Sequence, residues 1–183
     1  MVELLPFFVH LLGLRDPHGV THSEHVTELA FDLGRAAGLN DKELDLLEFA
    51  ASVHDIGKIA INEFVIYKPG KFTEAEYIMV QQHARLGSNL IKTLGVDPSV
   101  DSIILNHHEN FDGTGYPNGT RGDEIPLGAR IIRIVDSFDA LMSNRGYRPA
   151  YSRKKTLGIL ERDARFYDPD ILGLFFNKVA HKH

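Results

Sequence analysis

The sequence contains no cysteine among its 183 residues. Disulfide bonds and thiolate metal sites are therefore excluded, and any metal ion must be held by nitrogen and oxygen donors. A chain without disulfides also fits a reducing compartment, so we expect a cytoplasmic protein.

Long apolar segments are scarce as well. The main one, residues 4–14, contains Pro6 and His10, has no basic region before it and is too short to span a bilayer. We interpret it as a leading amphipathic helix, about residues 1–15, rather than a signal peptide. We therefore expect no association with a membrane.

The chain as a whole has an excess of negative charge. The formal net charge is −5, and the lysines and arginines form no stripe, so a surface for a nucleic acid polymer is not expected. An anionic substrate would need local positive charge, which metal ions can supply. The hydrophobic fraction of 43% and the charged fraction of 25% are those of an ordinary globular protein of one compact domain.

Helical periodicity runs through most of the sequence. Capping boxes at Asn40/Glu43 and Thr73/Glu76 mark two helix starts, and Gly38 is placed to end the helix before them. Pro126 is expected at the first position of a later helix. The expected helices cover residues 19–37, 41–54, 73–94, 98–108 and the segment from 126 onward, and Ser152 and Pro169 open two short ones.

No alternating strand of convincing length is present. The apolar run 59–66 is ambiguous, and a short extended segment is an alternative there. Residues 109–125, which we call the glycine loop, contain too much glycine for a helix and are expected to form a structured loop. The sequence predicts an all-α, single-domain helical bundle over residues 1–183, with the leading helix, a motif-bearing core of about residues 16–170, and a C-terminal helix and tail from about 171.

Potential metal ligands are spread over five of the expected helices or their ends. Each lies on or beside a helix whose opposite face is apolar, so all can point into one pocket of a bundle. They are His22, His54, Asp55, His83, His107, His108 and Asp136. A lone histidine on a helix is more often an ordinary polar residue, so the prediction depends on the joint pattern.

The spacing of these residues favours more than one ion. Seven donors exceed what one metal needs, the carboxylate of Asp55 can bridge two cations, and the adjacent His107 and His108 point in different directions. The sequence therefore predicts a multinuclear site. Lys58 follows Asp55 by three residues and shares its helical face.

The ordered motifs resemble a known family. The strings His54-Asp55-Ile56-Gly57-Lys58, His107-His108-Glu109 and Asp112-Gly113-Thr114-Gly115-Tyr116-Pro117 are similar to those of the HD-GYP subgroup of the HD phosphohydrolase superfamily. The resemblance extends from Asp16 to Pro169. It implies an HD-type bundle around two or three divalent ions, most commonly iron or manganese. It also implies hydrolysis of cyclic di-GMP to pGpG, or onward to GMP.

The resemblance also implies roles for single residues. The seven donors named above would be the metal ligands, and a hydroxide bridging two metals would attack phosphorus. Asp55 and Lys58 would be catalytic, and Lys58, Arg145 and Arg148 would contact phosphate. Tyr116 would contribute to substrate binding, either by stacking on a guanine or by packing the glycine loop.

Four positions depart from the family pattern: Asn62 and Gly146 replace usual prolines, and the other two, His18 and His25, are histidines. His18 stands where members with a third metal carry glutamate, and its i, i+4 spacing to His22 can put both rings on one helical face. We hypothesise that His18 reaches a third metal. His25 replaces a usual arginine and is expected behind the ligands or on the surface rather than on a metal.

Three functions remain open at this stage. The first is hydrolysis of cyclic di-GMP, the second is hydrolysis of another cyclic dinucleotide, and the third is a non-catalytic module that binds the dinucleotide or a partner. A complete ligand set argues against the third. Many members carry receiver or sensor domains, so a regulatory domain or partner protein is a further expectation, while the oligomeric state is not predicted.

Overall fold

The computed structural model describes residues 5–15, 17–144 and 149–182, with the backbone alone described for residues 5, 6, 14, 15, 17 and 18. The described residues contain no strand, which confirms the all-α prediction. The α-helices are α1 (Leu5–Arg15), α2 (Pro17–Ala36), α3 (Asp41–Val53), α4 (Glu63–Ile66), α5 (Glu74–Thr93), α6 (Pro98–Asn106), α7 (Leu127–Met142), α8 (Arg153–Arg162) and α9 (Pro169–Leu174). Short 3₁₀ turns are η1 (Ile56–Ala60), η2 (Gly122–Glu124) and η3 (Ala164–Phe166), and a π-helical turn, η4, covers Phe175–Val179.

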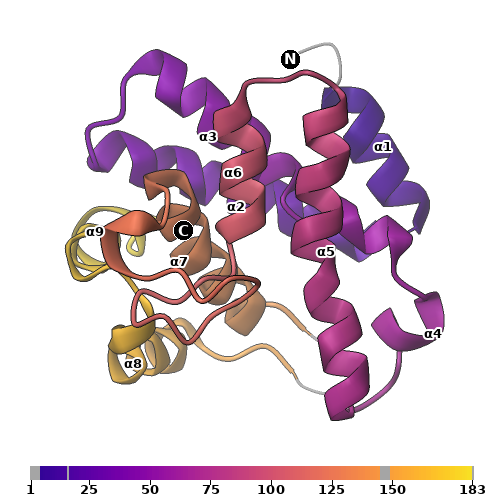
Figure 1. Cartoon of the computed structure of the whole chain (residues 1–183). Coiled ribbons are helices and arrows are strands. Elements are labelled where there is room, and N and C mark those ends of the chain that lie inside the picture. The colour runs from indigo at the N-terminus through magenta and orange to yellow at the C-terminus, as the bar shows by residue number, and fades with distance from the viewer. Residues whose placement is uncertain (1–4, 16, 145–148, 183) are drawn as a thin grey trace.

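The helices pack around one continuous apolar core. Helices α2 and α3 form a hairpin, α3 lies against α6, α6 runs beside α5, and α7 closes the bundle against α2 (Figure 1). Ile131, Ile132 and Val135 of α7 are fully buried between these helices, and Phe138 packs edge-to-face on Phe175. Within the described residues, no helix combines the length and the apolar character needed to cross a bilayer.

Most helix ends lie where the sequence predicts them. Both capping boxes are present: the Asn40 N–H donates to Glu43 Oε2 at 2.9 Å, and the Thr73 N–H donates to Glu76 Oε2 at 2.7 Å. Gly38 follows α2 with a φ of 85°, the left-handed conformation that favours glycine at a helix end. Ser152 caps α8, and Pro169 begins α9.

One ambiguity is resolved, and one local prediction is wrong. The run 59–66 is mostly helical, because η1 and α4 occupy all of it except the extended Ile61 and Asn62, whose side chain accepts the Phe64 N–H at 2.9 Å to start α4. Pro126 lies one residue before α7 rather than at its first position. Its ψ of 138° is extended, and its carbonyl accepts the first helical N–H groups.

Gly57 sets the position of the η1 turn. A Cβ atom at Gly57 would lie 2.0 Å from the His83 carbonyl oxygen and 2.5 Å from the Gly87 nitrogen. Because only a residue without a side chain fits there, η1 lies directly against α5. This contact brings Asp55 and Lys58 beside His83.

Replacing Gly57 with alanine is expected to destabilise the fold by about 3 kcal/mol, because the added methyl group meets backbone atoms that cannot move independently. The matched control is Gly158→Ala on α8, where an added Cβ meets no atom within 4 Å. That change is expected to stabilise the helix by up to about 1 kcal/mol. Urea unfolding followed by circular dichroism measures both, and equal stability of the two variants would contradict the close-packing account.

Candidate metal centre

The structure brings all seven predicted donor residues together at one end of the bundle. Their donor atoms form two groups, and within each group the atoms lie within 4.8 Å of one another. The first group contains Asp55, His83, His107 and His108, and the second contains His22, His54 and Asp136. The donors come from α2, α5, α7 and the ends of α3 and α6.

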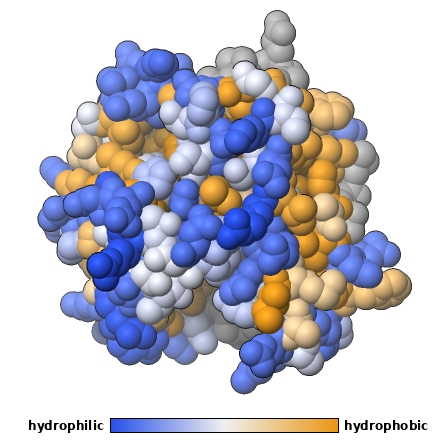
Figure 2. All heavy atoms as spheres, viewed as in Figure 1, coloured by the Kyte–Doolittle hydropathy of each residue, from blue (hydrophilic) through white to orange (hydrophobic). Residues whose placement is uncertain are grey.

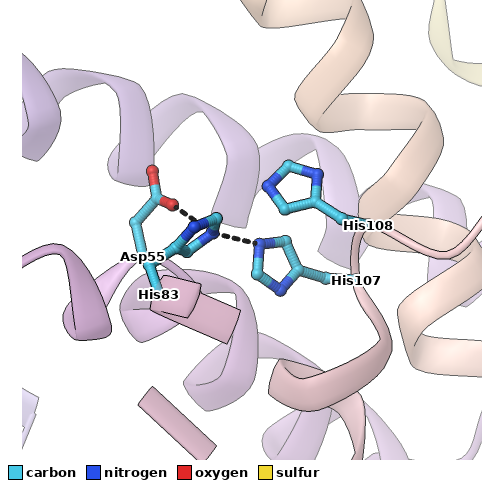
Figure 3. A group of neighbouring side chains, drawn as sticks. All are labelled: Asp55, His83, His107 and His108. Atoms are coloured by element: carbon cyan, nitrogen blue, oxygen red, sulfur yellow. Dashed lines mark hydrogen bonds and ion pairs between the residues drawn. The ribbon is translucent and has the colours of Figure 1, made fainter. Parts of the chain in front are cut away.

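The first group is compact and buried. The two Nε2 atoms of His83 and His107 lie 3.3 Å apart, and His83 Nε2 lies 3.4 Å from Asp55 Oδ1 (Figure 3). The rings of His107 and His108 have centroids 4.1 Å apart. Figure 3 shows the three rings converging on the space next to the carboxylate.

Backbone carbonyl groups fix the orientation of three histidine rings, two in the first group and one in the second. Each of the three histidines donates Nδ1–H to the carbonyl three residues earlier, at 2.6–2.7 Å; the pairs are His54 with Ala51, His83 with Val80, and His107 with Ile104. This bond selects one tautomer and leaves the Nε2 lone pair free. Three nitrogen donors are thereby aimed into the bundle.

Burial keeps the imidazoles of the first group neutral. Desolvation, and then the positive charge of neighbouring histidines, lowers the pKa of His107 to about 3. Desolvation also lowers the pKa of His83 and of His108. Neutral imidazole is the form that binds metals, so these rings need no deprotonation near pH 7.

The donor atoms fit a cation better than they fit one another. His83 and His107 both use Nδ1–H on a carbonyl, so their facing Nε2 atoms are both acceptors and repel across 3.3 Å. His54 Nε2 and Asp55 Oδ1 are buried without a hydrogen-bond partner, which is costly for polar atoms. A divalent cation held by nitrogen and oxygen removes both penalties.

Asp55 connects the two groups. Its Oδ1 lies 3.4 Å from His83 Nε2 in the first group, and its Oδ2 lies 3.6 Å from His54 Nε2 in the second. Burial opposes ionisation, but Lys58 and the neighbouring histidines hold the pKa of Asp55 well below its usual value. Lys58 Nζ donates to Asp55 Oδ2, as expected from their shared face.

His22 in the second group is bound by carboxylates at both ring nitrogens. Its Nδ1 lies 2.6 Å from Asp139 Oδ2, and its Nε2 lies 3.2 Å from Asp136 Oδ1. Burial alone would lower the pKa of His22, but the hydrogen bonds to Asp136 and Asp139 raise it to about 9. A metal ion held by His22 Nε2 and Asp136 would replace this interaction between the two side chains.

Asp139 is the residue that the sequence analysis missed. It accepts from His22 Nδ1 and from Ser143 Oγ through Oδ2, while Oδ1 lies 3.1 Å from His25 Nδ1. His25 therefore lies behind His22 beside Asp139, with its side chain 56% exposed, which fits the expected place behind the candidate ligands or on the surface. The available signal was the spacing of Asp136 and Asp139, which are three apart and so share one face of α7.

The glycine loop is attached beside the first group. The buried Glu109 accepts through Oε1 from the backbone N–H groups of Asn118 at 2.7 Å and Gly119 at 3.1 Å. Arg85 of α5 donates to the Pro117 carbonyl at 3.0 Å. The Tyr116 ring lies 4.8 Å from the His108 ring, tilted by 31°.

Three predicted residues lie outside what the structure describes. Arg145 and Arg148 fall in the segment 145–148, and for His18 the backbone at the start of α2 is described without the side chain. The phosphate contacts and the third-metal ligand therefore stay predictions.

The change Asp139→Asn is expected to weaken metal binding about 10- to 100-fold, since the partner behind a metal-binding histidine fixes its tautomer and orientation. Competition titration with a chromogenic chelator measures this. The control is Asp45→Asn, on the exposed side of α3. Equal metal affinity in the two variants would show that Asp139 does not position His22.

A family model described as HD domain matches residues 6–171. The cyclic di-GMP phosphodiesterase response regulator RpfG of Xanthomonas campestris is 38% identical over 170 residues, 91% of this chain and 45% of that protein. The 3'3'-cGAMP-specific phosphodiesterase 3 of Vibrio cholerae is 38% identical over 156 residues, 85% of this chain and 34% of that protein. The chain thus spans less than half the length of these relatives.

A solved structure has the same fold. It is described as an HDG"Y"P protein from Bdellovibrio bacteriovorus, and it aligns with a TM-score of 0.69 at 22% identity, covering 84% of this chain and 49% of that one. The family and the buried histidine–aspartate groups together indicate binding of divalent metal ions. Since the family model covers nearly the whole sequence and the donor groups contain its His54-Asp55 pair, the chain belongs to the HD domain family.

Proposed function

We propose that this domain is a metal-dependent phosphodiesterase that hydrolyses cyclic di-GMP to pGpG or onward to GMP. The observation that carries the proposal is the pair of donor groups joined by Asp55, with the glycine loop beside them. The resemblance to relatives named cyclic di-GMP phosphodiesterases supports the substrate.

Two ions, iron or manganese, are the proposed cofactors. Asp55, His83, His107 and His108 would hold one, and His22, His54, Asp136 and the second oxygen of Asp55 the other. His18 would serve a third ion. When bound, such ions supply Lewis-acid activation of water and neutralise charge on a phosphoryl oxygen. The donor set, with five imidazoles and no thiolate, fits these metals.

The residues of the chain provide charge and position. Asp55 stays ionised through Lys58 and the histidines, while its bond to Lys58 keeps that ammonium group beside the donor atoms. Lys58, whose side chain is one-third exposed, would then stabilise charge that develops on the phosphate. Arg145 and Arg148 would hold phosphate as well, and Tyr116 would line the substrate site.

The charge balance explains how an acidic protein can take an anionic substrate. The two donor groups contain only two carboxylates, Asp55 and Asp136, and the imidazoles of the first group are neutral. Two divalent ions therefore give the pocket a net positive charge despite the chain's formal charge of −5. The electrostatic attraction of an anionic substrate would therefore be confined to the pocket.

A second candidate substrate is 3'3'-cGAMP. The relative from Vibrio cholerae that is named for this substrate is as similar to the chain, at 38% identity, as the relative named for cyclic di-GMP. Both substrates are cyclic purine dinucleotides, so the same chemistry at phosphorus serves either.

Purification without oxygen, metal quantification and a chromatographic assay test the proposal. The loaded protein is expected to convert cyclic di-GMP to pGpG, and a chelator is expected to abolish turnover until metal is restored. An assay with 3'3'-cGAMP under the same conditions decides between the substrates. A fully loaded protein that hydrolyses neither dinucleotide would refute the enzymatic proposal and favour a binding module.

The change Asp55→Ala is expected to remove both metal binding and hydrolysis, since it deletes the oxygen donor that faces both groups. Circular dichroism should still show a helical protein, because Asp55 lies outside the apolar core. Asp45→Ala, on the exposed side of α3, is the control and should keep activity. Full activity in Asp55→Ala would rule out this residue as the centre of the site.

A further inference from the structure

We propose that Tyr77 is a stacking platform for a purine base of the substrate, one ring further from the metal centre than Tyr116. The inference rests on the proposed function and assigns the recognition of the base. It depends on three features of the described residues: the arrangement of aromatic rings, the exposure of Tyr77, and the contacts that hold its surroundings in place.

The rings form a series that leads outward from the donor atoms. The Tyr116 ring lies 4.8 Å from His108 and 6.3 Å from His83. The Tyr77 ring lies 6.3 Å from Tyr116 at an interplanar angle of 80°. Tyr77 therefore meets Tyr116 in an edge-to-face arrangement. In this arrangement Tyr116 covers at most one face of the Tyr77 ring, and the other face can stack on another planar group.

Exposure distinguishes the two tyrosines. Tyr116 is partly buried beside the histidines, whereas Tyr77 is 48% exposed. Figure 2 shows apolar side chains on the side where α1, α4 and α5 lie and also on the opposite side, and the exposed apolar residues of α5 include Tyr77, Ile78 and Met79. Of these three, Tyr77 is the aromatic one, and its ring adjoins the glycine loop.

The covalent structure of a nucleotide explains why a ring at this place is useful. The ribose separates the base from the phosphate, so a base cannot stack on the metal ligands while its phosphate lies among them. The base must therefore stack on a ring that lies further out than the metal-binding side chains, as Tyr77 does. Stacking on such a ring tolerates different bases, because every base has a π face.

The position of Tyr77 is fixed by polar contacts on either side. Glu76, the preceding residue, closes the capping box with Thr73 and accepts from Lys68 Nζ at 2.7 Å. Further along α5, Arg85 donates to Asn118 Oδ1 at 2.7 Å and so joins the helix to the glycine loop. The relative position of Tyr77 and Tyr116 is therefore set before a ligand binds, which lowers the cost of binding.

The test compares substrates with and without a base on metal-loaded protein. For Tyr77→Leu, KM for cyclic di-GMP is expected to rise at least about fivefold, since stacking acts on the bound substrate before the reaction. Hydrolysis of methyl 4-nitrophenyl phosphate, a diester without a nucleobase, should be unchanged. Tyr77→Phe should keep the KM of the unaltered protein for cyclic di-GMP. Ile78→Ala, a change at the exposed neighbour on the same helix, is the control for position and should keep that KM as well.

The outcomes separate this inference from the proposed function. Unchanged KM for cyclic di-GMP in Tyr77→Leu overturns the inference, as does an equal loss on both substrates, which would indicate a general disturbance of the site. If the unaltered protein does not hydrolyse cyclic di-GMP, the proposed function fails, and equilibrium binding of cyclic di-GMP to the loaded protein replaces turnover. At least about fivefold weaker binding by Tyr77→Leu then supports the platform, and equal binding overturns it.

Discussion

The bond from a histidine Nδ1–H to a carbonyl three residues earlier is the interaction on which the candidate site depends. His54 and His107 make it at the ends of α3 and α6, where the last carbonyl groups of a helix have no partner within the helix. One hydrogen bond thus satisfies the helix end and aims Nε2 into the bundle. The structural requirement of the helix and the chemical requirement of the site are met by the same atom pair.

The sequence predicts those parts of the molecule that depend on local spacing. Capping boxes, helix ends and the inward direction of the seven donors all follow from residues a few positions apart. Local spacing places Asp139 on the same face of α7 as Asp136, but its contact with His22 could not be obtained in this way, because that contact joins residues 117 positions apart through the packing of α2 on α7. The helical form of most of residues 59–66 stayed open for a similar reason, since the fit of Gly57 against α5 is a tertiary contact.

Under the proposed function, the attachment of the glycine loop explains how one metal centre would serve related substrates. Glu109 holds the loop through backbone N–H groups, and Arg85 holds it partly through the Pro117 carbonyl. Since the loop contributes main-chain N–H and carbonyl groups to these contacts, side chains of the loop other than Glu109, and side chains of α5 other than Arg85, can change without moving the loop away from the histidines. The similar identity to relatives named for cyclic di-GMP and for 3'3'-cGAMP agrees with a common framework and variable base recognition.

The position of the donors also bears on how the chain is held together. A protein without cysteine cannot use disulfides to join distant segments. An ion shared by His22 and Asp136 would link α2 to α7, and one shared by His83 and His107 would link α5 to α6. Closing such long loops reduces the conformational entropy of the unfolded chain, as a covalent cross-link does. The catalytic metals would then also be removable cross-links, and the stability of the bundle would rise and fall with the supply of the ion.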